Sequence, residues 1–319
     1  MERDAKIFVA GHRGLVGSAI ERNLISRGFR RIVTRTRSQL DLRDGHAVAE
    51  FFRQERFDYV FLAAAKVGGI AANRDSPGEF IRDNLCIQTN VVDAAYRTLV
   101  KRLLFLGSSC IYPKLAPQPL KEEYLLTGEL EPTNEAYAIA KIAGIKMCQA
   151  YNRQFGTSFL SAMPTNLYGP HDNFDPHTSH VLPALIRKMH EAKEQSSPFV
   201  EVWGSGRPRR EFLHADDLAD ACVHLMESYP EDDIVNIGMG EDLTIRELAE
   251  LVKAVVGYSG ELRFNPDMPD GTPRKLLDCS RMERLGWRAK ISLRDGLAGT
   301  YRWFLENIAA KSEERRILS

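Results

Sequence analysis

The sequence is poor in cysteine, carries no net charge and contains no long apolar run. Five cysteines are scattered over 319 residues without a CxxC spacing, so a disulfide-stabilised secreted domain is not indicated and a reducing compartment fits best. Lysine plus arginine and aspartate plus glutamate each number 43, which argues against nucleic acid as a partner. Since neither a signal peptide nor a bilayer-length apolar segment is present, we expect a cytoplasmic protein that does not enter the membrane.

The first half of the sequence alternates short apolar runs with amphipathic stretches. We expect strands at residues 6–10, 31–34, 59–65, 102–107 and 159–164, separated by helices at 15–27, 45–54, 80–99 and 136–155. The runs are continuously apolar, as in a parallel sheet that helices cover on both faces. The sequence therefore predicts an α/β fold with a Rossmann-like doubly wound parallel sheet.

A glycine-spaced turn joins the first expected strand to the first expected helix. Gly11, Gly14 and Gly17 follow a GxxGxxG spacing. The first glycine allows a tight turn, the second lets a pyrophosphate approach the backbone, and the third permits close helix–strand packing. Because the helix N-terminus then faces the anion, the strand, turn and helix together favour a dinucleotide site over a turn without a ligand.

The end of the second strand indicates which dinucleotide binds. A carboxylate there typically holds the ribose hydroxyls of NAD, whereas this chain has Arg35 and Arg37, with Arg13 in the glycine loop. Guanidinium groups bind phosphate oxygens in pairs, which suits the 2′-phosphate of NADP. Asp41 lies too far along the chain to be the usual ribose acid, so we expect NADP(H); a solvated basic turn is the alternative.

After Asn166 the alternation becomes less regular. We expect a helix over 181–194, and then a short strand and a helix that Asp216 or Asp217 caps. The charged residues 311–319 are expected to fray. We predict an NADP-binding domain at 1–165 and a smaller C-terminal α/β substrate domain at 166–319, with part of 211–238 returning to the first domain.

Tyr137 and Lys141 are four residues apart in an expected helix, so their side chains project from the same face. A neighbouring ammonium favours the phenolate and lowers the pKa of the phenol, which makes the tyrosine a better acid or base near neutral pH. A surface helix would show the same spacing. The phosphate-binding turn upstream favours a catalytic pair.

Two further polar residues follow the strand at 102–107. Ser108 lies beyond the carboxyl end of that strand, where parallel sheets bind their ligands, and its hydroxyl can donate to a carbonyl. Cys110 lies in the same turn, where a modestly lowered pKa would permit proton exchange. The alternatives are a serine that forms the turn and a cysteine that packs in the core.

Longer segments over nearly the whole chain point to one family. They include GHRGLVGSAI, FLGSSCIYPK, EPTNEAYAIAKIAGIK, MPTNLYGPHDNF and DGTPRKLLD. Through them the sequence resembles the GDP-L-fucose synthases of the extended short-chain dehydrogenase/reductase superfamily. The glycine loop and the YxxxK pair are common to the superfamily, whereas SSCIYP combined with PTNLYGPHDNF is specific to this branch.

The resemblance implies an NADPH-dependent 3,5-epimerase and 4-reductase that converts GDP-4-keto-6-deoxy-D-mannose to GDP-L-fucose. Removing the proton on C3 or C5 gives an enolate whose charge lies on the C4 ketone oxygen, and Ser108 and Tyr137 are expected to hold that oxygen. The resemblance assigns proton exchange at the two carbons to Cys110 and His180. Lys141 is expected to lower the pKa of Tyr137 and to bind the nicotinamide ribose.

His180 allows two other interpretations. It precedes an apolar helix, where a histidine is often a cap or a half-buried core residue. It also lies near His171, His177, Asp172 and Asp175, but their spacing matches none of the usual zinc patterns, so we expect no metal. With the resemblance, proton transfer is the better interpretation.

The resemblance also implies the binding residues. Cofactor contacts are expected from Gly11, His12, Arg13, Gly14, Leu15, Val16, Gly17, Arg37, Asp41, Leu42, Leu106, Gly107, Ser108, Lys141, Pro164, Asn166, Leu167 and His180. Substrate contacts are expected from Lys188, Trp203, Arg210 and Asp270. Of these, Arg210 suits a pyrophosphate and Trp203 a base or ribose.

Other functions stay open as alternatives. A nucleotide-sugar 4,6-dehydratase of this fold typically carries an acid pair where Ser109 and Cys110 stand, and a simple 4-epimerase would not need the Cys110 and His180 pair. A non-catalytic NADP-binding regulator would not need Ser108 with Tyr137. The resemblance further implies a homodimer through the helices at 80–99 and 136–155, although their apolar stripe would also be satisfied inside one subunit.

Overall fold

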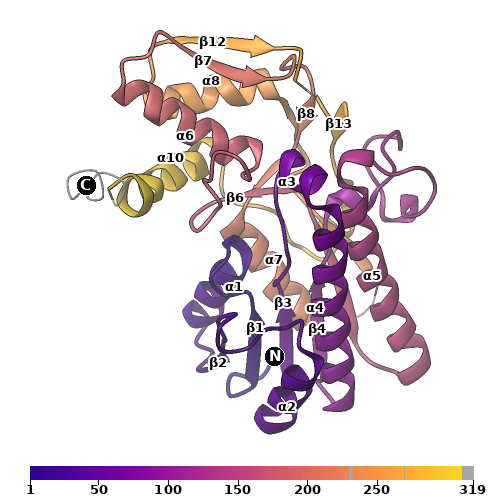
Figure 1. The fold of residues 1–319 in the computed structure, drawn as a ribbon. Coiled ribbons are helices and arrows are strands. Elements are labelled where there is room, and N and C mark those ends of the chain that lie inside the picture. The colour runs from indigo at the N-terminus through magenta and orange to yellow at the C-terminus, as the bar shows by residue number, and fades with distance from the viewer. Residues whose placement is uncertain (230–232, 269, 311–319) are drawn as a thin grey trace.

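The protein is described by a computed structural model covering residues 1–229, 233–268 and 270–310. Its centre is a six-stranded sheet in the order β10-β5-β4-β3-β1-β2, in which every neighbouring pair is parallel (Figure 1). The strands are β1 (Lys6–Ala10), β2 (Arg31–Val33), β3 (Tyr59–Leu62), β4 (Arg102–Leu106), β5 (Phe159–Pro164) and β10 (Ile234–Ile237). This sheet confirms the predicted α/β, doubly wound architecture.

Helices cover both faces of the sheet. One face carries α1 (Leu15–Ser26) and α7 (Ala215–Ser228), and the other carries α2 (Gly45–Glu55), α4 (Pro77–Arg97) and α5 (Glu135–Phe155). Successive residues of a strand point to opposite faces, so Ile7 and Val9 join the core under α1 and α7 while Phe8 joins the core under α2. Since both faces are buried, the strands are apolar throughout.

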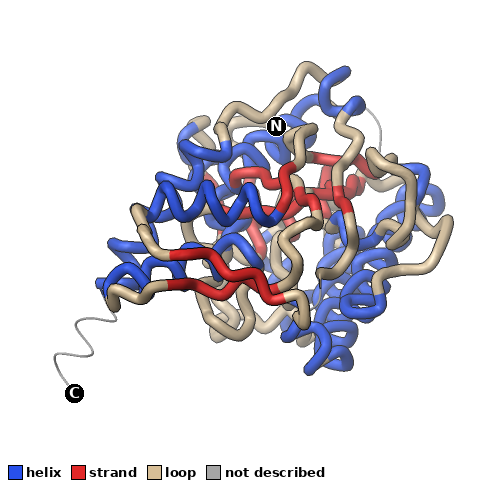
Figure 2. The backbone as a smooth tube through the Cα atoms, turned by 90° about the horizontal axis from the view of Figure 1, so that it is seen from above, coloured by secondary structure: helices blue, strands red, loops and turns tan. Residues whose placement is uncertain are grey.

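A smaller unit has a core of its own. It packs α6 (Val181–Glu194), α8 (Ile245–Val256) and α10 (Leu293–Phe304) with the parallel strands β7 (Phe199–Trp203) and β12 (Glu261–Asn265), which lie side by side in Figure 2. The remaining strands are β6 (Asn166–Tyr168), β8 (Arg209–Arg210), β9 (Phe212–His214), β11 (Leu243–Thr244) and β13 (Arg274–Lys275). The remaining helices and helical turns are α3 (Ile70–Asp75), α9 (Ser280–Arg284), η1 (Ser109–Ile111), η2 (Glu122–Tyr124), η3 (Pro132–Asn134) and η4 (Leu305–Ala309).

The structure corrects some expected element bounds. β3 ends at Leu62, so residues 63–65 leave the sheet. α4 begins earlier than expected, because Pro77 fits the first turn of a helix, where its missing N–H costs nothing. The expected caps Asp216 and Asp217 are wrong: the ring of His214 accepts the N–H of Asp216 at 3.2 Å, and both aspartates lie in the first turn of α7.

The chain after residue 166 contributes to both units. α7 packs against α1, and β10 pairs with β5 at the edge of the central sheet. We propose that the domains divide at residues 1–165 and 166–319, with part of 211–238 belonging to the first; these bounds stay a prediction. The expectation for residues 311–319 lies outside the described residues.

All five cysteines lie in the described part of the chain and are free thiols. Cys110, Cys148 and Cys222 are buried, and the other two are partly buried. Across the described ranges, no helix combines the length and the apolar character that crossing a membrane requires.

Candidate active site

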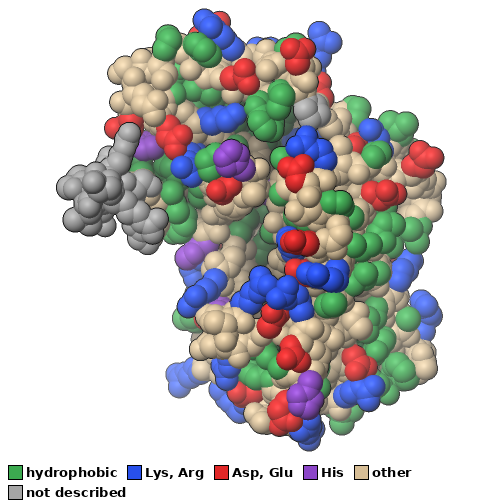
Figure 3. Space-filling view, in the orientation of Figure 1, with side chains coloured by type: hydrophobic (Ala, Val, Ile, Leu, Met, Phe, Trp, Pro, Cys, Tyr) green, Lys and Arg blue, Asp and Glu red, His purple; other side chains and the backbone are tan. Residues whose placement is uncertain are grey.

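A cavity of about 1090 Å³ lies between the central sheet and the smaller unit. Its walls include the residues that follow β1, β3 and β4, namely Gly11, Ala63 and Gly107, and residues of α6 and β7 such as Lys188 and Trp203. Figure 3 shows the molecule hollowed between the two units, with basic and acidic side chains together near the middle of this face. The cavity therefore lies where an open parallel sheet binds its ligands.

The glycine loop closes tightly at one end of the cavity. Gly11 has a φ of +89°, and a Cβ there would lie 2.8 Å from the backbone nitrogen of Ala64. A Cβ on Gly17 would lie only 2.1 Å from the carbonyl oxygen of Gly11. Gly14 precedes α1 and, among the described residues, no side chain caps the helix from this position. The first N–H groups of α1 are therefore available to an anion.

The structure brings most of the predicted cofactor residues to this cavity and leaves two outside its lining. The residues that line it are Gly11, Gly14, Leu15, Val16, Gly17, Arg37, Asp41, Leu42, Leu106, Gly107, Ser108, Lys141, Pro164, Asn166, Leu167 and His180. His12 and Arg13 are not among the described residues of the lining, and Arg13 is exposed. Backbone contact by the loop is thus better supported than the expected phosphate contact by Arg13.

The two arginines after β2 differ in their surroundings. Arg35 is 3.0 Å from the carboxylate of Glu55 and lies over the ring of Phe51, so its charge is already paired. Arg37 has a side chain 72% exposed, and its Nε is 3.8 Å from the carboxylate of Asp41. Asp41 is therefore closer to the expected phosphate site than its position along the chain indicated.

Ser108, Cys110, Tyr137, Lys141 and His180 all line the same cavity. Ser108 caps η1, where its hydroxyl accepts the N–H of Cys110 at 3.3 Å. Tyr137 and Lys141 extend from the same face of α5, with the ammonium 5.8 Å from the centroid of the tyrosine ring. Lys141 donates to the carbonyl oxygen of Leu106 at 2.7 Å, which fixes its position at the end of β4.

Desolvation has the largest effect on the pKa values of Tyr137 and Lys141. Desolvation raises the pKa of Tyr137 above its ordinary value, and the Ser108 hydroxyl acts in the opposite direction. Burial also lowers the pKa of Lys141 to about 8. The net shift of the Tyr137 pKa is therefore upward, opposite to the direction expected from Lys141, because removal of water disfavours the phenolate.

Cys110 and His180 differ in burial: Cys110 is buried, whereas His180 keeps an exposed surface at the cavity. Cys110 is only 7% exposed, and burial raises the pKa of its thiol, although Lys275 and Ser108 lower it in part. The polar turn that the sequence indicated is thus buried. Desolvation and the charge of Lys275 lower the pKa of His180. His180 occupies the N-cap position of α6, but within the described structure its side chain makes no capping hydrogen bond, which disfavours a mere cap.

Lys275 is a site residue that sequence reasoning missed. It lies on β13, lines the cavity, and interacts electrostatically with Cys110, Arg210 and Glu131. Burial lowers the pKa of its ammonium. Lys275 stands in the segment DGTPRK, which the resemblance had singled out for Asp270.

The predicted substrate residues lie on the far side of the cavity, on the smaller unit. The ammonium of Lys188 is 5.1 Å from the centroid of the Trp203 ring, and Trp203 is about half exposed. Burial lowers the pKa of Arg210 to about 10, and this side chain reaches the backbone carbonyl of Asp270 at 3.4 Å. The Asp270 carboxylate itself accepts the N–H and the O–H of Ser205, each at 2.7 Å. Asp270 therefore positions the loop that follows β7.

Together, the fold and the site define a dinucleotide-binding α/β enzyme with a second ligand site. Residues 7–238 match the model of the NAD dependent epimerase/dehydratase family, and the chain belongs to that family. Within it, the chain groups with GDP-L-fucose synthases, as the sequence resemblance indicated.

Three relatives illustrate this grouping. The chain is 62% identical to putative GDP-L-fucose synthase 2 of Arabidopsis thaliana, over 98% of this chain and 95% of that protein. It is 58% identical to the GDP-L-fucose synthase of Escherichia coli strain K12, over 95% of this chain and 97% of that one. A solved GDP-L-fucose synthetase from Naegleria fowleri, bound to NADP, has a TM-score of 0.90 and 30% identity, covering 97% and 96% of the two chains.

Proposed function

We propose that this chain is an NADPH-dependent 3,5-epimerase and 4-reductase that converts GDP-4-keto-6-deoxy-D-mannose to GDP-L-fucose. The observation that carries the proposal is a single cavity that combines a dinucleotide loop with Cys110, Tyr137 and His180. The relatives named above agree with this activity.

NADP(H) fits the residues present. The loop around Gly14 and the uncapped start of α1 suit the pyrophosphate, Arg37 suits the 2′-phosphate, and Lys141 suits the nicotinamide ribose. When bound, NADPH supplies the hydride that reduces C4 of the sugar. We assign Pro164, Asn166 and Leu167, which line the same wall, to the nicotinamide end, and Lys188, Trp203, Arg210 and Asp270 to the GDP end.

Side chains of this protein stabilise the C4 oxygen of the sugar and transfer the protons. Ser108 and Tyr137 donate hydrogen bonds to the C4 oxygen, where charge develops each time a neighbouring carbon loses its proton. Cys110 and His180 exchange the protons at C3 and C5, one removing and the other returning a proton. After both inversions Tyr137 gives its proton to the C4 oxygen as the carbon is reduced. Lys141, whose pKa is about 8, is largely charged at neutral pH and supports that transfer.

We further propose a homodimer through α4 and α5, which pack against each other, and of which α5 carries the exposed apolar residues Ile139 and Phe155. A cytoplasmic location agrees with the free thiols, since Cys110 must stay reduced to exchange protons. Light scattering after gel filtration tests the dimer: a mass near twice 36.0 kDa is expected, and a mass near 36.0 kDa would contradict it.

One assay tests the activity against its alternatives. The keto sugar and NADPH are mixed in deuterium oxide, NADPH consumption is followed by absorbance, and deuterium in the product is located by NMR. We expect NADPH consumption together with deuterium at C3 and C5. Consumption without deuterium would indicate a simple 4-reductase, whereas no consumption would favour the non-catalytic regulator.

A further inference from the structure

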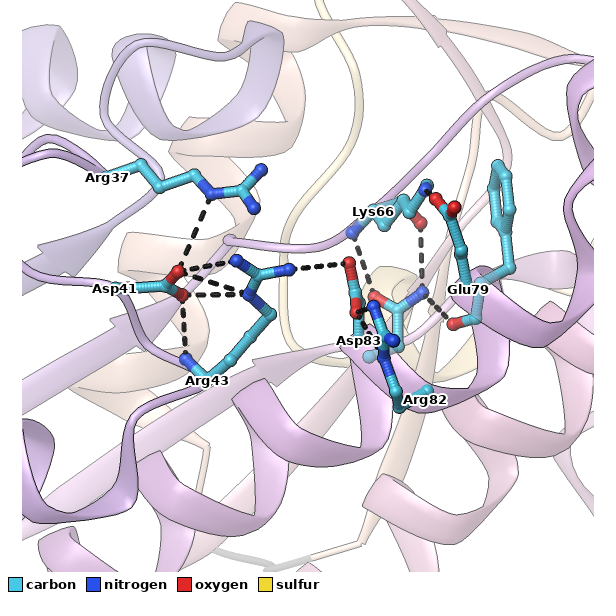
Figure 4. Close-up of polar contacts among 9 residues, drawn as sticks. Arg37, Asp41, Arg43, Lys66, Glu79, Arg82 and Asp83 are labelled. Atoms are coloured by element: carbon cyan, nitrogen blue, oxygen red, sulfur yellow. Dashed lines mark hydrogen bonds and ion pairs between the residues drawn. The ribbon is translucent and has the colours of Figure 1, made fainter.

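Five charged side chains of alternating sign lie along the wall of the cavity where the 2′-phosphate is expected. In order they are Arg37, Asp41, Arg43, Asp83 and Arg82 (Figure 4). All five line the cavity. Arg43 stands in the middle of the row, between the two carboxylates.

The negative charge of Asp41 is unfavourable for binding the 2′-phosphate of NADP. Its carboxylate is within 3.8 Å of Arg37, the guanidinium proposed to bind the 2′-phosphate. A carboxylate in this region typically accepts from the ribose hydroxyls of NAD, and it repels a phosphate that carries between one and two negative charges. Taken alone, Asp41 would favour NADH over NADPH.

Arg43 is placed to cancel that charge. Its Nη2 is 2.6 Å from one oxygen of Asp41, and its Nε is 3.0 Å from the other, a fork-to-fork geometry. These bonds lower the pKa of Asp41 to about 2, so the carboxylate is ionised and paired at neutral pH.

A second carboxylate orients Arg43 from the other side. The remaining nitrogen of Arg43, Nη1, is 3.2 Å from Asp83, which is nearly buried on α4. Arg82 in turn donates to Asp83 at 2.7 Å. Because all three nitrogens of Arg43 point at carboxylates, the geometry suits a residue that acts through Asp41 rather than one that binds phosphate itself.

We propose that Arg43 determines the cofactor preference of this chain by neutralising Asp41, which leaves Arg37 available for the 2′-phosphate. The inference rests on the proposed use of NADPH. Arg43 is thus a positioning residue, and the row carries one net positive charge, from three arginines and two aspartates.

The test is a double-mutant cycle on the whole protein, with the dissociation constants of NADPH and NADH measured by calorimetry. The readout is the ratio of the two constants, because general damage to the site weakens both dinucleotides alike. Arg43→Leu is expected to reduce the preference for NADPH about tenfold at low salt, since it leaves a close, partly exposed carboxylate beside the phosphate. Asp41→Asn alone is expected to keep or strengthen the preference.

The decisive variant is the double change Asp41→Asn with Arg43→Leu. Since no charge is left to neutralise, its ratio is expected to return to within about twofold of that of the unaltered chain. Arg53→Leu serves as the matched control: it removes the same charge from an exposed ion pair with Glu50 on α2 and is expected to leave the ratio unchanged.

Each outcome decides between distinct conclusions. An unchanged ratio in Arg43→Leu would overturn the inference while leaving the proposed function intact. A double variant as impaired as Arg43→Leu would also overturn it, because Arg43 would then act on the phosphate directly. Binding of neither dinucleotide by the unaltered chain would overturn the cofactor assignment and this inference together.

Discussion

Replacing Gly69 by alanine should disturb His180 without touching it. The N–H of Gly69 donates to the carbonyl oxygen of Thr178 at 2.9 Å, and a Cβ on Gly69 would lie 2.6 Å from the carbonyl oxygen of Ser179. Gly69 has a φ of −67°, which alanine adopts readily. The entire cost of the substitution is therefore the contact with the backbone immediately before His180.

The magnitude follows from that contact. Overpacking of this kind typically costs about 1–3 kcal/mol, and the loop relieves it by moving residues 178–180 away from Gly69. The side chain of Asn73 holds Gly69 in place, with bonds of 2.8 Å and 3.0 Å to the carbonyl oxygens of Gly68 and Gly69. A displacement near 1 Å of a catalytic group costs about a hundredfold in rate, so we expect deuterium exchange at C3 and C5 to fall by one to two orders of magnitude.

The assay separates this effect from simple loss of stability. Solvent deuterium entry is measured together with the NADPH dissociation constant and the melting temperature. NADPH affinity is expected to change little, because the nearest atoms to the added Cβ belong to Thr178 and Ser179 and not to the glycine loop. Gly78→Ala is the matched control: a Cβ there meets no atom of the described residues within 4 Å, so exchange should stay at the level of the unaltered chain. Undiminished exchange in Gly69→Ala would refute the reasoning.

Three further predictions concern the proposed catalytic groups. Cys110→Ser or His180→Gln should slow deuterium entry at C3 and C5 at least a hundredfold while NADPH affinity is retained; normal exchange in both variants would remove them from proton transfer. Tyr137→Phe should suppress NADPH consumption about a hundredfold or more, and reduction at the original rate would refute the donor assignment. Lys141→Met should stabilise the fold by about 1–3 kcal/mol at pH 7 while impairing reduction, because burial lowers the pKa of Lys141 from 10.5 to about 8. The folded state then binds fewer protons than the unfolded state between pH 8 and 10.5, so the unaltered chain gains stability from this group as the pH rises through that window. Denaturant melts should therefore show that the extra stability of Lys141→Met disappears above pH 10.5. Extra stability that does not depend on pH would contradict the assignment.

The central sheet could be predicted from the sequence because the patterns that specify it lie in short, continuous segments of the chain. Continuous apolar runs such as those of β1 and β4 require burial on both faces, and the glycine loop requires a strand before it and a helix after it. The cap of α7 could not be predicted, because aspartate is preferred at the N-cap position, and Asp216 and Asp217 were therefore better candidates than His214. Only the backbone geometry places the His214 ring over the free N–H.

Part of the candidate site could be predicted from the sequence, but its electrostatics could not. The resemblance selected Ser108, Cys110 and Tyr137, and the structure places all of them at one cavity. Burial depends on residues far apart in the chain, so neither the raised pKa of Cys110 nor the lowered pKa of Lys141 could be derived from spacing. Arg43 was missed for a similar reason: only the fold brings Asp83 of α4 next to it.

The dryness of the cavity links the two chemistries. Desolvation by the surrounding protein raises the pKa of Cys110 and Tyr137, and desolvation together with the charge of Lys275 lowers that of the partly open His180, so all three are neutral at pH 7. A neutral imidazole can remove a proton and a neutral thiol can return one, so either carbon can be inverted without an ionised side chain beforehand. Removal of the proton then creates an imidazolium and an enolate oxygen together, and a fixed donor stabilises that oxygen more in a region of low dielectric than in water. In the proposed mechanism Tyr137 meets that oxygen during both inversions and again when C4 is reduced, so a single hydroxyl would serve both the epimerisation and the reduction.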